Sequence, residues 1–180
     1  MTRTSNTKAQ HERDWGSSVA SGTVRGIRMF YVDSRLPLLV GHWGITWSPG
    51  ENIGRCILSR GIDRSPMHLY EDHEVADQHC SCGFYAYWGI GEIPAYQSAS
   101  PVFGVIDGYG TALIGSKGFR SSRARILGIT PNPEAYQELS RDALRQVSRH
   151  YGVSLLPDVD ALLTADLSLA GGRDAPVIRS

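Results

Sequence analysis

The sequence has no long hydrophobic run and no excess of charge of either sign. No apolar stretch approaches the ~20 residues that a membrane-spanning helix needs, and residues 1–22 lack the apolar centre of a secretory signal. We therefore expect a cytoplasmic protein without a membrane segment. Basic and acidic residues are balanced at 18 each. An electrostatic argument for a nucleic-acid or membrane partner must therefore rest on a local patch rather than on the whole chain.

Cysteine is also scarce, with three residues in a chain of 180. Cytosolic thiols stay reduced, and an odd number of cysteines does not suit a disulfide framework. The sequence contains no Walker phosphate-binding loop, no dinucleotide-binding glycine motif and no G-x-S-x-G nucleophile elbow. The usual sequence evidence for a nucleotide-binding enzyme or a serine hydrolase is therefore absent.

Short runs of branched and aromatic residues are present, and they predict mainly antiparallel strands in the first two thirds of the chain. The expected strands are residues 24–32, 36–47, 82–88 and 122–129. A hairpin is expected where Asp107-Gly108-Tyr109-Gly110 separates two β-branched runs, at residues 102–106 and 111–114.

Helical periodicity is confined to the end of the chain. We expect one helix to begin after an N-cap at Asn132, with Pro133 at its first position, and to end at Gly152. A shorter helix is expected after Pro157. Because the strands precede the helices, the predicted fold class is α+β, with strands and hairpins over residues 24–130.

Composition divides the chain into three parts. Residues 1–23 are polar and read as a flexible arm that is dispensable for folding, in which Trp15 is the one residue able to dock. Residues 24–170 are expected to form a single α+β domain, which suits the hydrophobic content of 41%. Residues 171–180 are expected to form a loose tail.

The most informative part of the sequence is a set of cysteine and histidine residues that suits a structural zinc ion. Cys80 and Cys82 are two positions apart, so an extended backbone presents both sulfurs on one face. We predict that Cys56 and His73 complete a Cys₃His site that stabilises the fold. His79 is the alternative fourth ligand, although it leaves the backbone on the face opposite to Cys80.

Three other interpretations of the same residues stay open. The cysteines can be reduced, buried residues that act as small hydrophobic groups. A catalytic metal is a second alternative, since the acidic residues Glu71, Asp72 and Glu74 flank His73. A cysteine nucleophile paired with a histidine is the third. The last two would make the protein a small hydrolase dependent on a metal or a cysteine.

The motif around these residues resembles one from a family of uncharacterised actinobacterial and actinobacteriophage proteins. Residues 47–52 (WSPGEN), Cys56, His73 and residues 80–86 (CSCGFYA) match a pattern of W-x-P-G-x-N, C, H-x-A-P and C-x-C-G-x-Y-A. The similarity covers about residues 36–130 and implies a phage-encoded origin, but it implies no activity. It places the three cysteines and His73 at motif positions. The chain departs from the pattern at Ala76, where the family has proline.

A second candidate site is the basic segment that contains Lys117, Arg120, Arg123 and Arg125. Arg123 and Arg125 share a face of an extended strand, which suits phosphate contact. The alternatives are a solvated strand edge and, for Arg120, an internal salt bridge to Asp107. The aromatic residues near the cysteines suit either a core or a base-stacking platform; they are Trp43, Trp47, Phe84, Tyr85, Tyr87 and Trp88.

Taken together, these patterns predict a non-catalytic, zinc-stabilised binding module that engages nucleic acid or a host protein. The alternatives are the small hydrolase and a purely structural or interaction protein without metal. A closed set of four chain ligands would separate the first prediction from the hydrolase, because it leaves no coordination position for an activating water.

Overall fold

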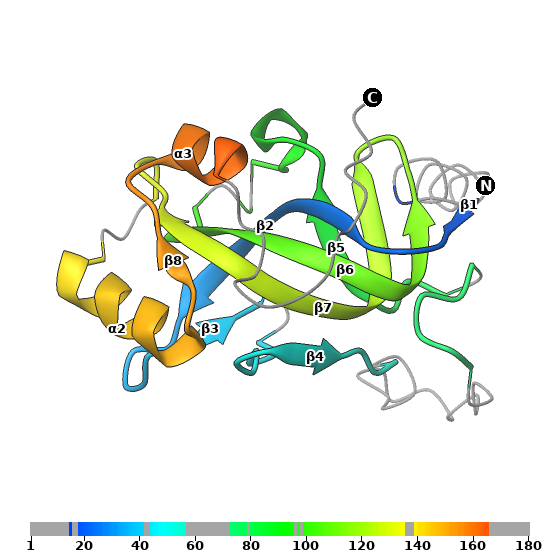
Figure 1. Ribbon diagram of the computed structural model, residues 1–180, viewed down its shortest axis with the longest axis horizontal. Coiled ribbons are helices and arrows are strands. Elements are labelled where there is room, and N and C mark those ends of the chain that lie inside the picture. The colour runs from blue at the N-terminus through cyan, green and yellow to red at the C-terminus, as the bar shows by residue number, and fades with distance from the viewer. Residues whose placement is uncertain are drawn as a thin grey trace, which may run out of the picture.

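The computed structural model shows a mixed α+β fold that is mostly strands (Figure 1). The structure describes residues 15, 18–41, 44–56, 73–78, 80–95, 97, 99–135 and 139–165. The strands are β1 (Ser18–Ala20), β2 (Val24–Val32), β3 (Leu39–Val40), β4 (Glu51–Ile53), β5 (Phe84–Tyr87), β6 (Val102–Ile114), β7 (Gly118–Pro131) and β8 (Ser154–Leu155). The helices are η2 (Ile90–Glu92, a 3-10 helix), α2 (Arg141–Tyr151) and α3 (Val159–Thr164). The predicted fold class is therefore confirmed.

The long strands β6 and β7 form the centre of the sheet and pair antiparallel over nearly their whole length. A tight turn joins them, in which the Gly115 amide donates to the Gly118 carbonyl at 2.8 Å. β2 pairs with the first half of β6, and β5 pairs with both β2 and β7. The strands β6, β2, β5 and β7 therefore close into a ring, and the remaining strands add at its edges.

Closure of this ring brings backbones close together, and glycines make the approach possible. A Cβ atom at Gly108 would overlap the Phe119 ring, and one at Gly118 would overlap the backbone of β5. The main core cluster then packs around large side chains that are fully buried, among them Phe30, Trp47 and Phe119. Burial of these aromatic rings is a dominant stabilising contribution to the domain.

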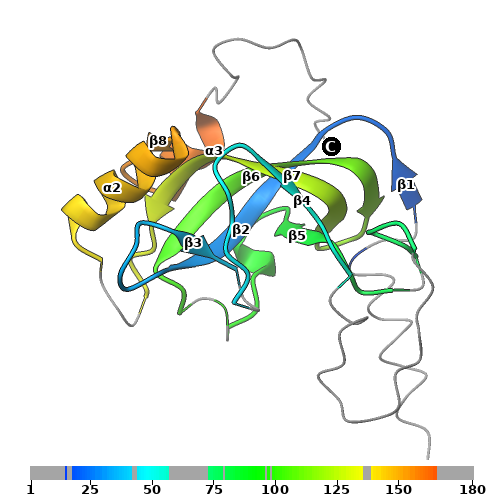
Figure 2. The same cartoon turned by 90° about the horizontal axis from the view of Figure 1, so that it is seen from below.

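The helices α2 and α3 cover the sheet at two different core clusters. α2 packs Leu144 and Tyr151 into the main cluster. The Tyr151 hydroxyl also donates to the Trp47 carbonyl at 2.7 Å and accepts from the Leu39 amide at 2.8 Å. α3 packs Leu162 into a second cluster. Figure 2 shows α2 and β8 at one end of the sheet and β1 at the other.

The predicted hairpin around Asp107 is wrong, because residues 102–114 form one continuous strand. The Asp107 side chain lies between Arg25 of β2 and Arg125 of β7, at 2.9 and 3.0 Å. These ion pairs hold the Asp-Gly segment in the ladder. The turn-like composition is accommodated instead by a shift of register between Tyr109 and Ala112, where Gly110 adopts a φ of 75°.

The start of the main helix also differs from the prediction. The N-cap is Ser140, whose hydroxyl accepts from the Ala143 amide at 3.2 Å. Asn132 instead ties two loops together, since its amide donates to the Ser100 carbonyl at 2.8 Å. The predicted end is confirmed, because Gly152 adopts the left-handed conformation with a φ of 65°. The shorter helix is confirmed as α3.

Two further expectations are modified by the strand pairing. Residues 18–20 of the expected arm form β1, which pairs with residues 112–114 of β6 because this edge of β6 offers unpaired backbone groups. The strand expected over residues 36–47 is reduced to β3 and a single bridge between Val40 and Thr46. Among the described residues, no helix has the length and apolar character needed to cross a membrane.

Candidate metal centre

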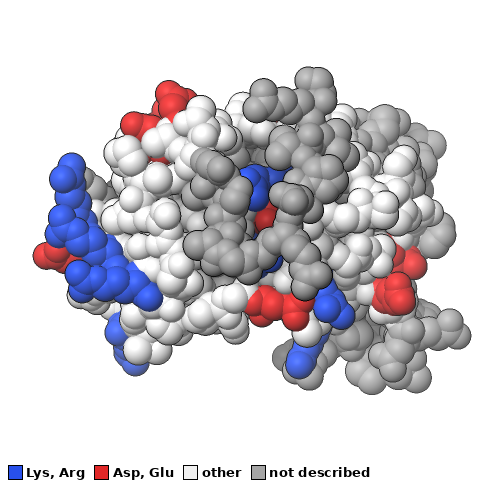
Figure 3. Space-filling model, viewed as in Figure 1, with Lys and Arg blue, Asp and Glu red and all other residues white. Residues whose placement is uncertain are grey.

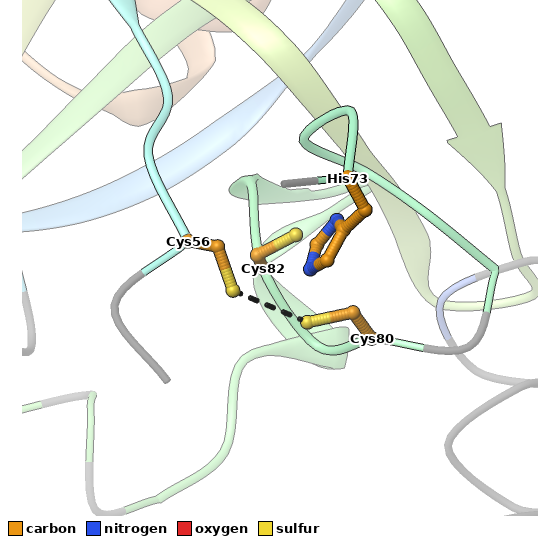
Figure 4. Close-up of side chains that lie close together, drawn as sticks. All are labelled: Cys56, His73, Cys80 and Cys82. Atoms are coloured by element: carbon orange, nitrogen blue, oxygen red, sulfur yellow. Dashed lines mark hydrogen bonds between the residues drawn. The ribbon is translucent and has the colours of Figure 1, made fainter. Parts of the chain in front are cut away.

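Cys56, His73, Cys80 and Cys82 come together at one place beside the sheet (Figure 4). Each offers one ligand atom, and the four atoms lie within 4.8 Å of one another. Cys56 follows β4, and Cys80 and Cys82 precede β5. Because β4 and β5 both pair with β7, cysteines that are far apart in the sequence become neighbours.

The spacing of these atoms suits a tetrahedral ion. A zinc–sulfur bond of about 2.3 Å places two sulfurs of a tetrahedral site about 3.8 Å apart. The Sγ atoms of Cys56 and Cys80 are 3.5 Å apart without any ion. Figure 4 shows the three sulfurs and the His73 ring directed toward one another. The four residues can therefore hold a metal ion with little rearrangement.

The His73 ring is held in the orientation that a metal ligand needs. Its Nδ1–H donates to the Glu74 carbonyl at 2.8 Å, so the lone pair of the ring that can bind a metal is on Nε2. Nε2 is buried and has no hydrogen-bond partner. The hydrogen bond to Glu74 raises the pKa of His73, and burial opposes that rise. Metal-bound histidines commonly donate their second ring nitrogen to a carbonyl in this way.

A turn at residues 77–80 and a residue of positive φ on either side of it, Ala76 and Gly83, shape the loop that carries these ligands. Ala76 has a φ of 67°, and the Cys80 amide donates to the Asp77 carbonyl at 3.2 Å. Proline cannot adopt a positive φ, so a proline would not fit the backbone conformation that Ala76 has here. Gly83 has a φ of 119°, and a Cβ there would lie 3.0 Å from the Ser121 carbonyl oxygen.

Arg120 supports the ligand loop from inside the protein. Its side chain lies within the fold with a relative exposure of 1%. The guanidinium donates to the carbonyls of Cys80, Cys82 and Asp77, the last at 2.8 Å and the Cys82 bond at 3.3 Å. No carboxylate among the described residues pairs with it. The alternative of an internal salt bridge from Arg120 to Asp107 is therefore wrong, although the side chain does lie inside the fold.

The half-buried thiol of Cys80 is protonated in the absence of metal. Burial raises the pKa of Cys80 to about 12. A thiolate is the form that binds metal, so an ion must displace this proton when it binds. The alternative fourth ligand, His79, lies outside the described residues. So do Glu71 and Asp72, two of the acidic residues that flank His73 in the sequence.

The structure separates the other members of the predicted basic segment. Arg125 is paired with buried Asp107, and Arg123 is paired with Glu51 at 3.3 Å. Arg123 and Arg125 lie two positions apart on β7, as expected, but each has an acidic neighbour. Lys117 lies in the turn between β6 and β7. With Arg120 inside the fold, these four residues do not form one continuous cationic surface.

Most of the aromatic residues near the cysteines belong to the core. Trp47, Phe84 and Tyr87 are buried, whereas Trp88 is 41% exposed and donates its indole N–H to the Gly115 carbonyl. Tyr85 lies between these extremes, and its hydroxyl donates to the Ser81 carbonyl at 2.6 Å. Trp43 lies outside the described residues. The described members therefore do not form an open stacking platform.

Sequence reasoning missed a row of exposed arginines on α2. Arg141, Arg145 and Arg149 are four positions apart and lie on the solvent side of the helix. Basic side chains gather at the α2 end of the molecule in Figure 3. The spacing of four residues was visible in the sequence, where it predicts one helical face.

Comparison with known proteins adds no functional assignment. No protein-family profile, curated protein or solved structure matches the chain. Function must therefore be inferred from the chemistry of the described side chains.

Proposed function

We propose that the protein is a non-catalytic binding module, stabilised by one structural zinc ion and acting in the cytoplasm. The observation that carries the zinc assignment is the convergence of three thiols and the unpartnered Nε2 of His73 within 4.8 Å. Three thiolates and one imidazole are a donor set that zinc prefers. Four chain ligands close the coordination sphere, which disfavours the hydrolase alternative because no position remains for water.

The charge of the site supports the same assignment. A zinc ion with three thiolates and a neutral histidine carries one net negative charge. Arg120 lies directly behind this site, and its partners are the neutral carbonyls of Cys80, Cys82 and Asp77. A buried cation needs a countercharge, and the metal–thiolate cluster would supply it. The loop and the arginine are thus matched to a cluster of this charge.

The test of the zinc assignment is elemental analysis of the purified protein, with the expectation of about one zinc per chain. The Cys82→Ser variant should lose the metal and much of its stability, because metal binding and folding are coupled. Ser81→Ala is the matched control, since it changes the residue between two ligands and should retain the zinc. Metal-free protein whose melting temperature does not respond to a chelator would contradict the proposal.

For the partner of the module we propose nucleic acid, bound along the arginine row of α2. Arg141, Arg145 and Arg149 are exposed, and the only ion pair that α2 forms among the described residues joins Arg145 to Asp142. Helical positions four apart are separated by about 6 Å along the axis, so the row can contact successive phosphates. Arginine suits this role because its planar fork forms paired hydrogen bonds to phosphate.

Fluorescence anisotropy with labelled single- and double-stranded oligonucleotides tests this surface. If three phosphates are contacted, the logarithm of the duplex affinity should fall with log salt at a slope of about −2.7. Replacement of all three arginines by glutamine should remove most of that slope. The control is the double variant Lys117→Gln with Arg123→Gln, which changes the basic segment before and within β7. It should reduce the salt dependence of binding by less than the α2 variant does. Absence of binding at low salt would make a protein partner the better assignment.

A further inference from the structure

Arg28 of β2 is a half-buried cation without a countercharge among the described residues. Its guanidinium carbon lies 5.0 Å from the centroid of the Trp47 ring and 5.9 Å from that of Phe30. One nitrogen, Nη1, donates to the Tyr85 carbonyl at 2.6 Å. No carboxylate among the described residues forms an ion pair with it. Arg120, by contrast, has the proposed metal cluster as its countercharge.

The remaining donors of Arg28 lie along one edge of the guanidinium. Nε is buried and has no hydrogen-bond partner, and the hydrogen bond to Tyr85 leaves from Nη1 rather than from Nη2. The N–H groups of Nε and Nη2 form the edge that binds a carboxylate or a phosphate with two parallel hydrogen bonds. The indole N–H of Trp47 is also buried without a partner. Buried donors are almost always satisfied, so a group of unsatisfied donors requires an acceptor.

Nη2 of Arg28, which shares this edge with Nε, and the indole N–H of Trp47 both lie beside Gly41. A Cβ atom added to Gly41 would lie 3.0 Å from Arg28 Nη2 and 3.3 Å from Trp47 Nε1. The Gly41 amide donates to the Ile45 carbonyl at 2.8 Å, which holds the backbone in a tight loop at this point. Gly41 has no left-handed backbone conformation that would require glycine. The missing side chain therefore keeps space beside two donors.

Arg28 stays charged under physiological conditions. Burial lowers the pKa of Arg28 to about 10, which is still well above neutral pH. Even partial burial of a guanidinium without a countercharge is unfavourable. Stacking on Trp47 offsets part of this penalty through cation–π attraction, but an aromatic ring does not accept the two in-plane N–H groups.

We propose that Arg28, Trp47 and Gly41 form a binding site for a small oxyanion, the carboxylate or phosphate group of a ligand. The oxyanion takes two hydrogen bonds from Nε and Nη2 of Arg28 and a third from the indole N–H of Trp47. Its negative charge neutralises the guanidinium. This site uses none of the metal ligands and none of the α2 arginines, so it is independent of the proposed function.

Heteronuclear NMR at constant ionic strength tests the site, with chloride replaced stepwise by inorganic phosphate or by acetate. The Arg28 Nε–H and Trp47 indole N–H resonances are identified with Arg28→Lys and Trp47→Phe. Both resonances should move together and saturate with one dissociation constant. The arm that saturates at the lower concentration identifies the oxyanion as phosphate-like or carboxylate-like.

Gly41→Ala is the decisive variant, because its methyl group fills the space beside both donors without straining the backbone. It should weaken anion binding at least tenfold while the spectrum of the rest of the domain is retained. Gly89→Ala is the matched control, since a Cβ there meets no atom within 4 Å, and it should bind as the unmodified protein does. Resonances that respond to neither anion, or a response that Gly41→Ala leaves unchanged, would overturn the proposal.

Discussion

The role of Arg120 gives the sharpest quantitative prediction. Its guanidinium donates to the carbonyls of Asp77, Cys80 and Cys82, while its Nε is buried without a partner. Hydrogen bonds from a charged donor contribute about 1.5–3 kcal/mol each, and removing one partner of a buried charged interaction typically costs about 3–5 kcal/mol. We therefore expect Arg120→Met to lower the free energy of unfolding of the zinc-loaded protein by about 4 kcal/mol.

Urea denaturation with saturating zinc measures this loss. Arg120→Lys keeps the charge but reaches fewer carbonyls, so it should cost about half as much. Arg145→Met is the matched control: it removes an exposed arginine whose pairing with Asp142 is worth about 0.3–0.5 kcal/mol. A loss of less than about 1 kcal/mol for Arg120→Met would refute the argument. The loss should also be larger with zinc than after chelation, because the thiolate cluster is the countercharge.

Two other predictions concern the N-terminal residues and the pH dependence of zinc binding. Removal of residues 1–23 should lower the melting temperature, contrary to the expectation from composition. The deletion removes β1 from the edge of β6, and it removes the Trp15 ring, whose centroid lies 4.7 and 4.9 Å from those of Tyr85 and Tyr87. Differential scanning calorimetry of Trp15→Ala should show part of the same decrease, and an unchanged melting temperature in either variant would contradict the prediction. Zinc affinity should weaken about tenfold or more for each unit of falling pH. The reason is that the Cys80 thiol, whose pKa is raised to about 12, keeps its proton in the metal-free protein and must lose it when zinc binds. Competition with a chelator at several pH values measures the affinity, and a pH-independent affinity would exclude Cys80 as a ligand.

The sequence was sufficient to predict the parts of the fold that local patterns determine. β2 begins and ends where alternation predicted, and Gly152 ends α2 where its conformational freedom predicted. The clustering of Cys56, His73 and the Cys-x-Cys pair was also predictable, because thiol chemistry restricts the use of such residues. Whether a metal is bound there stays a prediction.

The parts that could not be predicted depend on contacts between distant residues. Asp107-Gly108 has the composition of a turn, but Arg25 and Arg125 hold Asp107 in the middle of a long strand, and these partners are 82 and 18 positions away. Arg120 was predicted either to join a cationic surface with its basic neighbours or to pair internally with Asp107, and neither prediction identified the carbonyls that it contacts. Only the pairing of β5 with β7 brings the carbonyls of Asp77, Cys80 and Cys82 to the Arg120 guanidinium.

The tight connection between β6 and β7 has a consequence for the order of folding. Hairpins with short turns form in about 1–10 μs because little chain entropy is lost on closure. Cys56 and Cys80 are 24 positions apart, and they meet only after β4 and β5 have both docked on β7. We expect the ligands to converge after the rate-limiting barrier. A bound ion would then lower the unfolding rate constant while leaving the folding rate constant almost unchanged. The ion would therefore increase the kinetic stability of a domain that is already assembled.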